Sequence, residues 1–157
     1  MTIDVDIQNT LDANDSAIMQ LPATNDVFSA VRLVCDAFND GRGEVTVRFV
    51  DMAESQALNA AYRDKDKPTN VLSFPADLPE FIPSDLLGDL VICPEVVLSE
   101  AAEQHKLPLH HYQHLIIHGT LHLLGFDHIE EAEAVVMEAH EVTLLQKLNI
   151  DDPYQDH

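Results

Sequence analysis

The amino-acid sequence predicts an α+β fold, in which helices pack mainly on one face of a small mixed sheet of four strands. Two patterns predict this fold. Short stretches of alternating apolar and polar residues indicate strands, and longer stretches with apolar residues at every third or fourth position indicate helices. Their order along the chain is β-α-β-α-β-β-α-α-α. Residues 1–157, of which 46% are hydrophobic, are enough for one domain with a sizeable core.

The first predicted strand is followed by a loop and a helix. Residues 3–7 alternate strictly between apolar and charged side chains, which indicates a strand. Residues 8–24 are polar and irregular and predict a loop. A helix is expected over residues 26–39, where apolar residues recur at helical spacing, and Thr24 or Asn25 is expected to cap it.

The second strand and second helix are predicted by a change of periodicity. Residues 44–50 alternate again and indicate a strand. Asp51 and Glu54 form a capping-box pattern, in which two side chains satisfy backbone N–H groups at the start of a helix. The sequence therefore predicts a helix that runs through Tyr62.

The second half of the chain contains two strands and then three helices. Residues 70–75 and 86–93 indicate strands that are joined by a proline-rich loop, with a turn expected at Gly88 before the second of them. Pro75 suggests that the first of the two lies at a sheet edge, because proline cannot donate a ladder hydrogen bond. Three helices are expected over residues 94–104, which begin with a proline suited to a first helical position, 109–124 and 130–148.

Three histidines in this second half form a metal-binding pattern. His118, His122 and His128 follow the spacing H-x3-H-x5-H. The first two stand one helical turn apart, with Cβ atoms roughly 6 Å from each other. Gly125 can adopt the left-handed conformation that ends a helix, so the chain can double back and bring His128 to the other two rings. The three imidazoles would leave one corner of a tetrahedron open, as in a catalytic Zn²⁺ site. The sequence thus predicts a metal site on a helix and the turn after it.

The same histidine spacing occurs in the metzincin peptidases, where the residue after the first histidine is a catalytic glutamate. Here that residue is Gly119, so the ligand frame is present without its carboxylate base. This combination favours a metal-assisted hydrolysis other than ordinary peptide cleavage. The alternative is that His118 and His122 are core histidines of an apolar helix, although buried rings without partners are costly.

The charge of the chain restricts its partners. A formal net charge of -20 repels polyanions at long range, so nucleic-acid binding needs a local basic patch or a metal. The densest basic stretch contains Arg63, Lys65 and Lys67. No apolar run approaches the ~20 residues of a membrane span and the start does not look like a signal peptide, so we expect no membrane partner and a cytoplasmic location. Cys35 and Cys93 are expected to be buried thiols.

Two further segments give the histidine array a family context. Residues 58–75 read Leu-Asn-Ala-Ala-Tyr-Arg-Asp-Lys-Asp-Lys-Pro-Thr-Asn-Val-Leu-Ser-Phe-Pro, and residues 87–90 read Leu-Gly-Asp-Leu. Together with the array, they resemble the YbeY family of endoribonucleases. The resemblance implies a zinc-dependent bacterial enzyme that cleaves single-stranded RNA in 16S rRNA 3'-end maturation and ribosome quality control. It also implies small-subunit rRNA, small-subunit ribosomal proteins and assembly GTPases as partners.

The resemblance also assigns residues. Metal binding falls on the three histidines of the array, and contact with RNA falls on Arg63. A guanidinium group suits a phosphate because its planar fork of donors matches phosphate oxygens, and the alternative is a surface arginine paired with Asp64 or Asp66. The family usually has aspartate where this chain has Asn70, which leaves the role of that carboxylate open here.

Three more candidates come from their positions alone. Asp127, beside the third histidine, is expected to accept a proton or orient the site, or else to cap the next helix. Ser73 belongs to the edge strand along which substrate is expected to lie. His114, one turn before His118, is expected either to support the metal ligands from behind them or to line the RNA-binding surface. Two other functions remain open, a zinc peptidase with an unusual base and a ribosome-assembly binding module whose metal is structural.

Overall fold

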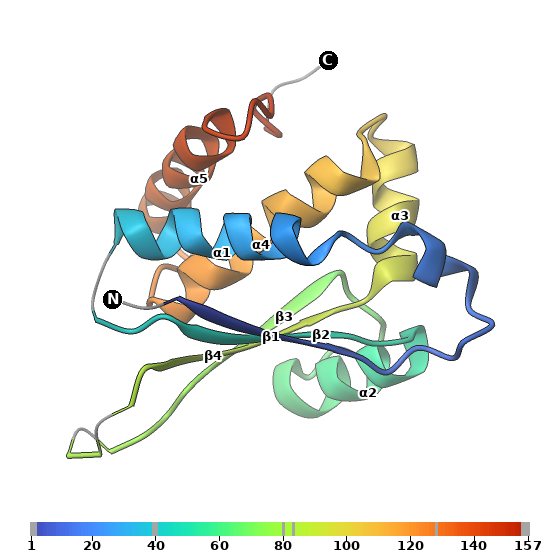
Figure 1. Cartoon of the computed structure of the whole chain (residues 1–157), viewed down its shortest axis with the longest axis horizontal. Helices are drawn as coiled ribbons and strands as arrows, with labels where there is room; N and C mark the ends of the chain where they lie inside the picture. Colours follow the sequence, from blue (N-terminus) through green and yellow to red (C-terminus); the bar gives the residue numbers. More distant parts are fainter. Residues whose placement is uncertain (1–2, 39–40, 80, 83, 128, 155–157) are drawn as a thin grey trace.

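The computed structural model describes residues 3–38, 41–79, 81–82, 84–127 and 129–154, and it contains one four-stranded sheet flanked by helices (Figure 1). The strands are β1 Asp4–Asn9, β2 Glu44–Phe49, β3 Val71–Pro75 and β4 Leu86–Ile92. The helices are η1 Ser16–Gln20, α1 Thr24–Ala37, α2 Met52–Arg63, α3 Pro94–Glu103, α4 Pro108–Leu123 and α5 Glu131–Gln146. The predicted α+β class and the predicted order of strands and α-helices are confirmed.

The sheet is mixed, as expected. Its strand order is β1-β2-β4-β3, in which β1, β2 and β4 run parallel and β3 pairs antiparallel with β4. Strand β3 is therefore at an edge, which confirms the inference from Pro75. Figure 1 shows α1, α3, α4 and α5 on one side of the sheet and α2 alone on the other. Helices thus lie mainly on one face, and none in the described ranges is long and apolar enough to cross a membrane.

Two predicted details of the first half are wrong. The segment predicted as a loop contains the short 3-10 helix η1, which begins because the Asp15 side chain accepts a hydrogen bond from the Ala17 N–H at 2.9 Å. Helix α1 begins earlier than predicted, and its N-cap residue is Ala23, so neither Thr24 nor Asn25 occupies that position.

The predicted start of α2 is confirmed. The Asp51 side chain accepts a hydrogen bond from the Glu54 N–H at 2.8 Å. The same helix ends with Arg63, and Asp64 follows in the left-handed conformation with φ of 58°. The cap therefore determines where the helix starts, and the left-handed residue turns the chain directly after Arg63.

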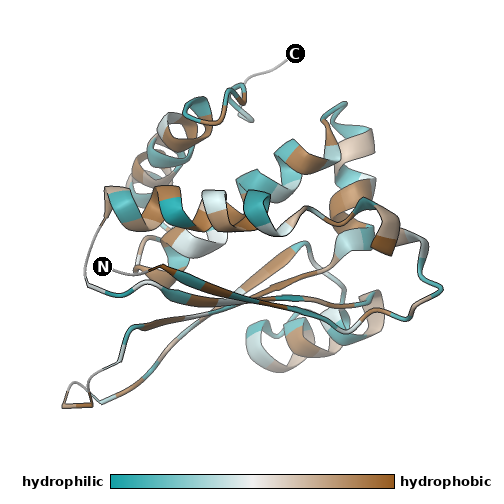
Figure 2. Cartoon of the chain, in the orientation of Figure 1, coloured by the Kyte–Doolittle hydropathy of each residue, from teal (hydrophilic) through white to brown (hydrophobic). Residues whose placement is uncertain are grey.

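Helix α4 is held in the centre of the core. Its Tyr112, Ile116 and Leu121 are completely buried in a cluster shared with the buried residues of β2, β4 and α1. The Tyr112 ring meets the Phe49 ring of β2 edge to face, with centroids 6.1 Å apart. Figure 2 shows apolar residues along the strands and an alternation of apolar and hydrophilic residues along α1 and α5. The side chains of α4 are thus carried on a rigid element. Cys35 and Cys93 are buried thiols, as predicted.

Gly88 allows β3, β4 and α4 to approach one another closely. It lies inside β4, at a shift of register that leaves Leu87 without a partner in β2, and not in a turn before the strand as the sequence suggested. Its φ is +146°, and a Cβ atom there would collide with the Phe74 carbonyl oxygen and lie 2.9 Å from Cδ2 of Leu123. Glycine is required at this position for both backbone and steric reasons.

We predict that Gly88→Ala lowers the free energy of unfolding by about 3 kcal/mol or more, because backbone strain and overpacking add. Gly41→Ala is the matched control, since Gly41 has φ of +91° but nothing within 4 Å of its Cβ position. The control should lose only about 1 kcal/mol. Denaturant unfolding measures both, and equal losses would contradict a steric role for Gly88.

Candidate functional site

The first two histidines of the array lie side by side, as their spacing predicts. His118 and His122 are on the last two turns of α4, and their Nε2 atoms are 3.2 Å apart. Two ligand nitrogens at Zn–N distances of about 2.0–2.1 Å in a tetrahedron lie about 3.3 Å apart, so the pair has the spacing that a zinc ion requires. Their donor chemistry also suits Zn²⁺, which imidazole binds readily.

The turn after these histidines is formed as predicted. Helix α4 ends in a Schellman motif, in which Phe126 N–H donates to Leu121 O at 3.1 Å and Gly125 N–H donates to His122 O at 3.0 Å. Gly125 has φ of +101°. The chain turns back here, and Asp127 lines the same cavity as the histidine pair. His128, the third predicted ligand, lies outside the described residues. Within the described ranges, no group of three or more potential ligand side chains is placed to hold a metal ion.

Glu141 of α5 orients two histidines of α4, His114 and His118, by accepting a hydrogen bond from each. It is completely buried, and its Oε1 atom accepts three hydrogen bonds, from His114 Nε2 at 2.7 Å, His118 Nδ1 at 3.2 Å and the Tyr154 hydroxyl at 2.8 Å. A carboxylate only accepts, so the proton of neutral His118 is on Nδ1. The Nε2 lone pair then points to His122. A ligand histidine held by a carboxylate in this way is typical of metal sites.

Glu141 is charged despite its burial. Burial by itself raises its pKa, but the hydrogen bonds from His114 and His118 outweigh this and hold the pKa at about 2. For His114, burial is the strongest influence, and it lowers the pKa in spite of the hydrogen bond to Glu141. The carboxylate is therefore a permanent acceptor at neutral pH, and His114 is a neutral donor to it.

A large cavity brings most of the predicted site residues together. Its volume is about 820 Å³, and its walls come from the end of α2, the edge strand β3, the end of α4 and the turn that follows. The predicted residues in its lining are Arg63, Ser73, His118, His122 and Asp127. His114 is separate from them, because it lines a smaller cavity of about 380 Å³ on the other side of His118.

Arg63 and Ser73 differ in the hydrogen bonds that their side chains already form. Arg63 is exposed, and no hydrogen bond or ion pair joins it to Asp64 or Asp66 in the described part of the chain; Asp66 instead accepts from Gln56 at 3.0 Å. Ser73 is engaged, since its hydroxyl donates to the Gly119 carbonyl at 3.2 Å and joins β3 to α4. Arg63 is thus available to bind a ligand, whereas the Ser73 hydroxyl is used to hold β3 against α4.

The structure explains the glycine that follows the first histidine. Gly119 faces the sheet, where a Cβ atom would lie 2.7 Å from Leu90 Cδ2 and 3.2 Å from Ser73 Oγ. A glutamate there would require the Leu90 and Ser73 side chains to shift from their packed positions. Asp127 is the described carboxylate in the lining of the large cavity, and it does not serve as N-cap of α5, which is Glu130.

Asn70 also has a structural role. Its side-chain N–H donates to Glu100 Oε1 at 3.0 Å, and His111 Nε2 lies 3.0 Å from the same oxygen. Burial raises the pKa of Glu100, but these contacts outweigh it and leave the pKa below its usual range. An aspartate in place of Asn70 would put a second carboxylate beside Glu100, so asparagine suits this neighbour.

Sequence reasoning missed Glu141. A pattern in the sequence does mark it, because Glu141 shares a helix face with the buried residues Met137, Leu144 and Leu145. An acidic residue in an apolar stripe needs a partner of its own, and buried charge is tolerated only when paired. The partners come from α4 and from Tyr154 beyond the end of α5, and they could not be paired without the fold.

Comparison with known proteins identifies the family. A family model described as Endoribonuclease YbeY matches residues 9–149. The chain belongs to the YbeY family. Endoribonuclease YbeY of Chromohalobacter salexigens is 53% identical over 157 residues, which cover 99% of this chain and 100% of that protein. Endoribonuclease YbeY of Alteromonas mediterranea is 46% identical over 156 residues, with 98% of each chain covered.

A solved structure supports the fold of this YbeY-family chain. The solution structure of TM1509 from Thermotoga maritima superposes with a TM-score of 0.53 over 97% of this chain and 99% of that one. The sequence identity is 22%, so the likeness concerns the fold alone. The family resemblance that the sequence motifs suggested is confirmed by the family model and by the two relatives.

We predict that Glu141→Gln lowers the free energy of unfolding of the metal-free protein by about 1–3 kcal/mol, because the amide N–H₂ is left buried among donors. Glu138→Gln, on the same helix and only partly buried, should change it by less than about 0.5 kcal/mol. Thermal or denaturant unfolding distinguishes the two. A harmless Glu141→Gln exchange would contradict the orienting role of Glu141.

Proposed function

We propose that residues 1–157 form a single metal-dependent hydrolase domain, a zinc-dependent endoribonuclease that cleaves single-stranded RNA. Membership of the YbeY family supports an endoribonuclease and implies a role in rRNA maturation. The observation that carries the metal dependence is the histidine pair, whose Nε2 atoms are 3.2 Å apart while Glu141 holds the Nδ1 proton of His118.

The proposed ligands are His118, His122 and His128. When bound, zinc would polarise a phosphoryl oxygen and lower the pKa of a water molecule. Three neutral imidazoles suit Zn²⁺ better than Mg²⁺, which prefers oxygen ligands. The role of the protein is to hold each imidazole in the correct orientation, and Glu141 does this for His118 through the hydrogen bond from Nδ1.

The remaining residues of the large cavity act on the RNA. Arg63 binds a phosphate and offsets the negative charge that develops during cleavage, since a guanidinium donates two parallel hydrogen bonds to phosphate oxygens. Asp127 accepts a proton or orients the site from the turn after α4. Strand β3 forms one wall, where the backbone near Ser73 lies beside the RNA. His114 acts indirectly, because it donates a hydrogen bond to Glu141, which in turn orients His118.

The biological setting follows from the family. We infer that the substrate is small-subunit rRNA, with 16S rRNA 3'-end maturation and ribosome quality control as the processes served, and that small-subunit ribosomal proteins and assembly GTPases are the protein partners. A chain with net charge -20 needs such help, because it repels RNA except where basic side chains or a metal are concentrated.

The two other functions are less well supported. A zinc peptidase would need a carboxylate base next to the first ligand, and Gly119 faces the sheet at that position. A binding module with a structural metal would need a fourth protein ligand. Among the described residues of the large cavity, Asp127 is the only further side chain of ligand type, so the coordination sphere of the loaded protein separates the two cases.

We predict that His118→Ala, His122→Ala and His128→Ala each lose zinc, because two imidazoles hold the ion far more weakly than three. His110→Ala, on the first turn of α4 and outside the large cavity, is the control and should retain one zinc per chain. Elemental analysis after dialysis measures occupancy, and cleavage of single-stranded RNA before and after chelation measures dependence. Full occupancy in His122→Ala would overturn the ligand assignment.

We predict that Arg63→Ala lowers kcat/KM for RNA by about 100-fold, which corresponds to a loss of about 2.7 kcal/mol of transition-state stabilisation. The melting temperature should change by no more than about 2 °C, because Arg63 is exposed. Arg32→Ala, which removes a surface arginine paired with Asp36 on α1, should affect neither quantity. A large loss of stability with unchanged cleavage would show a structural role for Arg63.

A further inference from the structure

A second cavity adjoins the proposed catalytic one. It has a volume of about 380 Å³ and is formed by the end of α3, residues 111–118 of α4 and the segment after α5. Asn70 and His118 line both cavities, so the two are neighbours that meet at the first metal ligand. A strand of RNA bound in the large cavity at His118 would have its next nucleotide nearest to the second cavity.

Lys106 gives the second cavity a cation. It is partly buried and follows a left-handed residue, His105, whose φ is 56°. The Lys106 N–H donates to the Ala101 carbonyl at 2.9 Å, which closes a Schellman motif at the end of α3 without the usual glycine. Only 8 residues of this chain are lysine or arginine, against 28 acidic ones, so a lysine held beside the site is a notable placement.

The acidic residue in the described lining of this cavity, Glu100, already accepts hydrogen bonds. Glu100 accepts from Asn70 and His111 through Oε1, both at 3.0 Å. Lys106 is attracted to Glu100 electrostatically, but within the described residues it forms no ion pair with it at 4 Å or less. Glu141, behind the wall, accepts its three hydrogen bonds from other residues. The ammonium group of Lys106 is thus the charged donor left for a phosphate.

Tyr154 gives the cavity an aromatic wall that is fixed in place. Its hydroxyl donates to Glu141 at 2.8 Å, its backbone N–H donates to Asp152 at 2.8 Å, and its ring meets the His114 ring edge to face at 5.6 Å. The residue is nonetheless 45% exposed. A half-exposed ring held at its polar end can stack on a base without further ordering, and base stacking on aromatic rings is a common way to bind single strands.

We propose that the cavity lined by Lys106 and Tyr154 is a nucleotide subsite, which binds the RNA nucleotide next to the cleaved bond through its base and the following phosphate. This proposal rests on the proposed endoribonuclease function. It assigns the ring of Tyr154 to the base and Lys106 to the phosphate, and it predicts that longer strands bind better than a dinucleotide.

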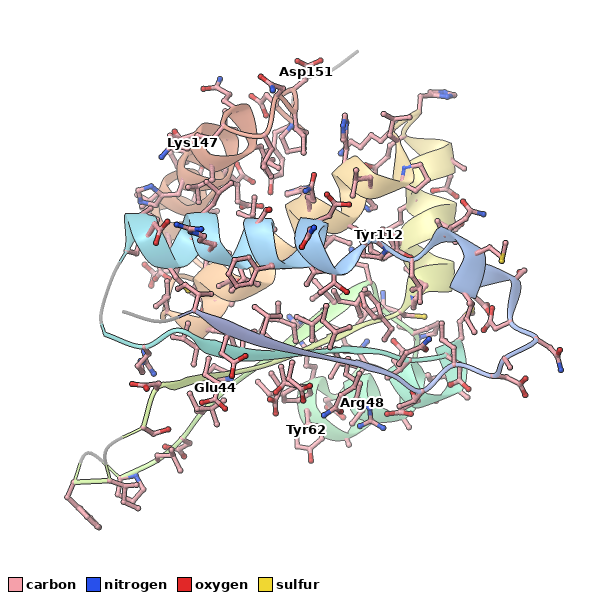
Figure 3. All side chains as sticks on the ribbon, in the orientation of Figure 1. Glu44, Arg48, Tyr62, Tyr112, Lys147 and Asp151 are labelled. Atoms are coloured by element: carbon pink, nitrogen blue, oxygen red, sulfur yellow. The ribbon has the colours of Figure 1, made fainter. Side chains whose placement is uncertain are left out.

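The test compares a fluorescently labelled hexauridylate with diuridylate, using zinc-loaded protein. Lys106→Ala should weaken hexauridylate binding about tenfold, the loss expected for one charge-assisted phosphate contact, and should leave kcat/KM for diuridylate within about twofold. Diuridylate has no phosphate beyond the cleaved one, so Lys106 has nothing to bind in it. Lys147→Ala is the control for charge, because Lys147 is exposed at the end of α5 and lines neither cavity. Figure 3 shows it far from Tyr62, a residue of α2 in the wall of the large cavity.

A second pair of variants tests the aromatic wall. Tyr154→Leu removes the ring and should weaken binding of both RNAs, whereas Tyr154→Phe keeps the ring and should bind both more tightly than Tyr154→Leu. Zinc content, measured in every variant, should be unchanged in Lys106→Ala.

Three results would overturn the subsite. The first is an unchanged affinity of Lys106→Ala for hexauridylate. The second is an equal loss of affinity for both RNAs in that variant. The third is a lower melting temperature of Lys106→Ala without a change in RNA binding, which would show that Lys106 stabilises the fold through Glu100. Failure of the proposed function is distinguishable, because then the wild-type protein neither binds nor cleaves either RNA, and the subsite falls with it.

Discussion

One buried carboxylate oxygen organises the functional end of this molecule. Oε1 of Glu141 accepts hydrogen bonds from two histidines of α4 and from Tyr154, and so it ties together α4, α5 and the segment after α5. A buried charge costs free energy unless it is hydrogen-bonded, so these contacts fix the positions of the carboxylate and its three donors relative to one another. The direction of the His118 lone pair, and with it the proposed zinc site, follows from this contact.

The position of α4 on the sheet imposes the other constraint. Gly119 and Gly88 let the helix lie directly against β3 and β4, which brings the edge strand to the histidine pair but leaves no space for a carboxylate beside His118. Groups for chemistry must therefore come from elsewhere. The structure offers Arg63 from the end of α2 and Asp127 from the turn after α4, on the walls of the same cavity. This arrangement fits a reaction in which a phosphate is held and its charge offset better than one that needs a base next to the first ligand.

Local patterns in the sequence predicted most of the fold and the part of the site that depends on local spacing. The order of strands and helices, the edge position of β3, the capping of α2 by Asp51 and the glycine that ends α4 all follow from interactions within a few residues. The pairing of His118 with His122 is of the same kind, since one helical turn separates them. The 3-10 helix η1 was missed because Asp15 caps a segment with no apolar periodicity. Glu141, Tyr154 and Lys106 were missed because their partners are distant in the sequence, and only the folded chain shows that His114 faces Glu141 and not the large cavity.

The tautomer of His118 is the most direct test of the orienting role of Glu141. ¹⁵N NMR of the imidazole rings measures this tautomer in the metal-free and the zinc-loaded protein. We expect a proton on Nδ1 of His118 in both states, with Nε2 unprotonated in the first and bound to zinc in the second. A His118 ring that carries its proton on Nε2 in the metal-free protein, or that binds zinc through Nδ1, would contradict it, because Glu141 would then not be the group that orients this ligand.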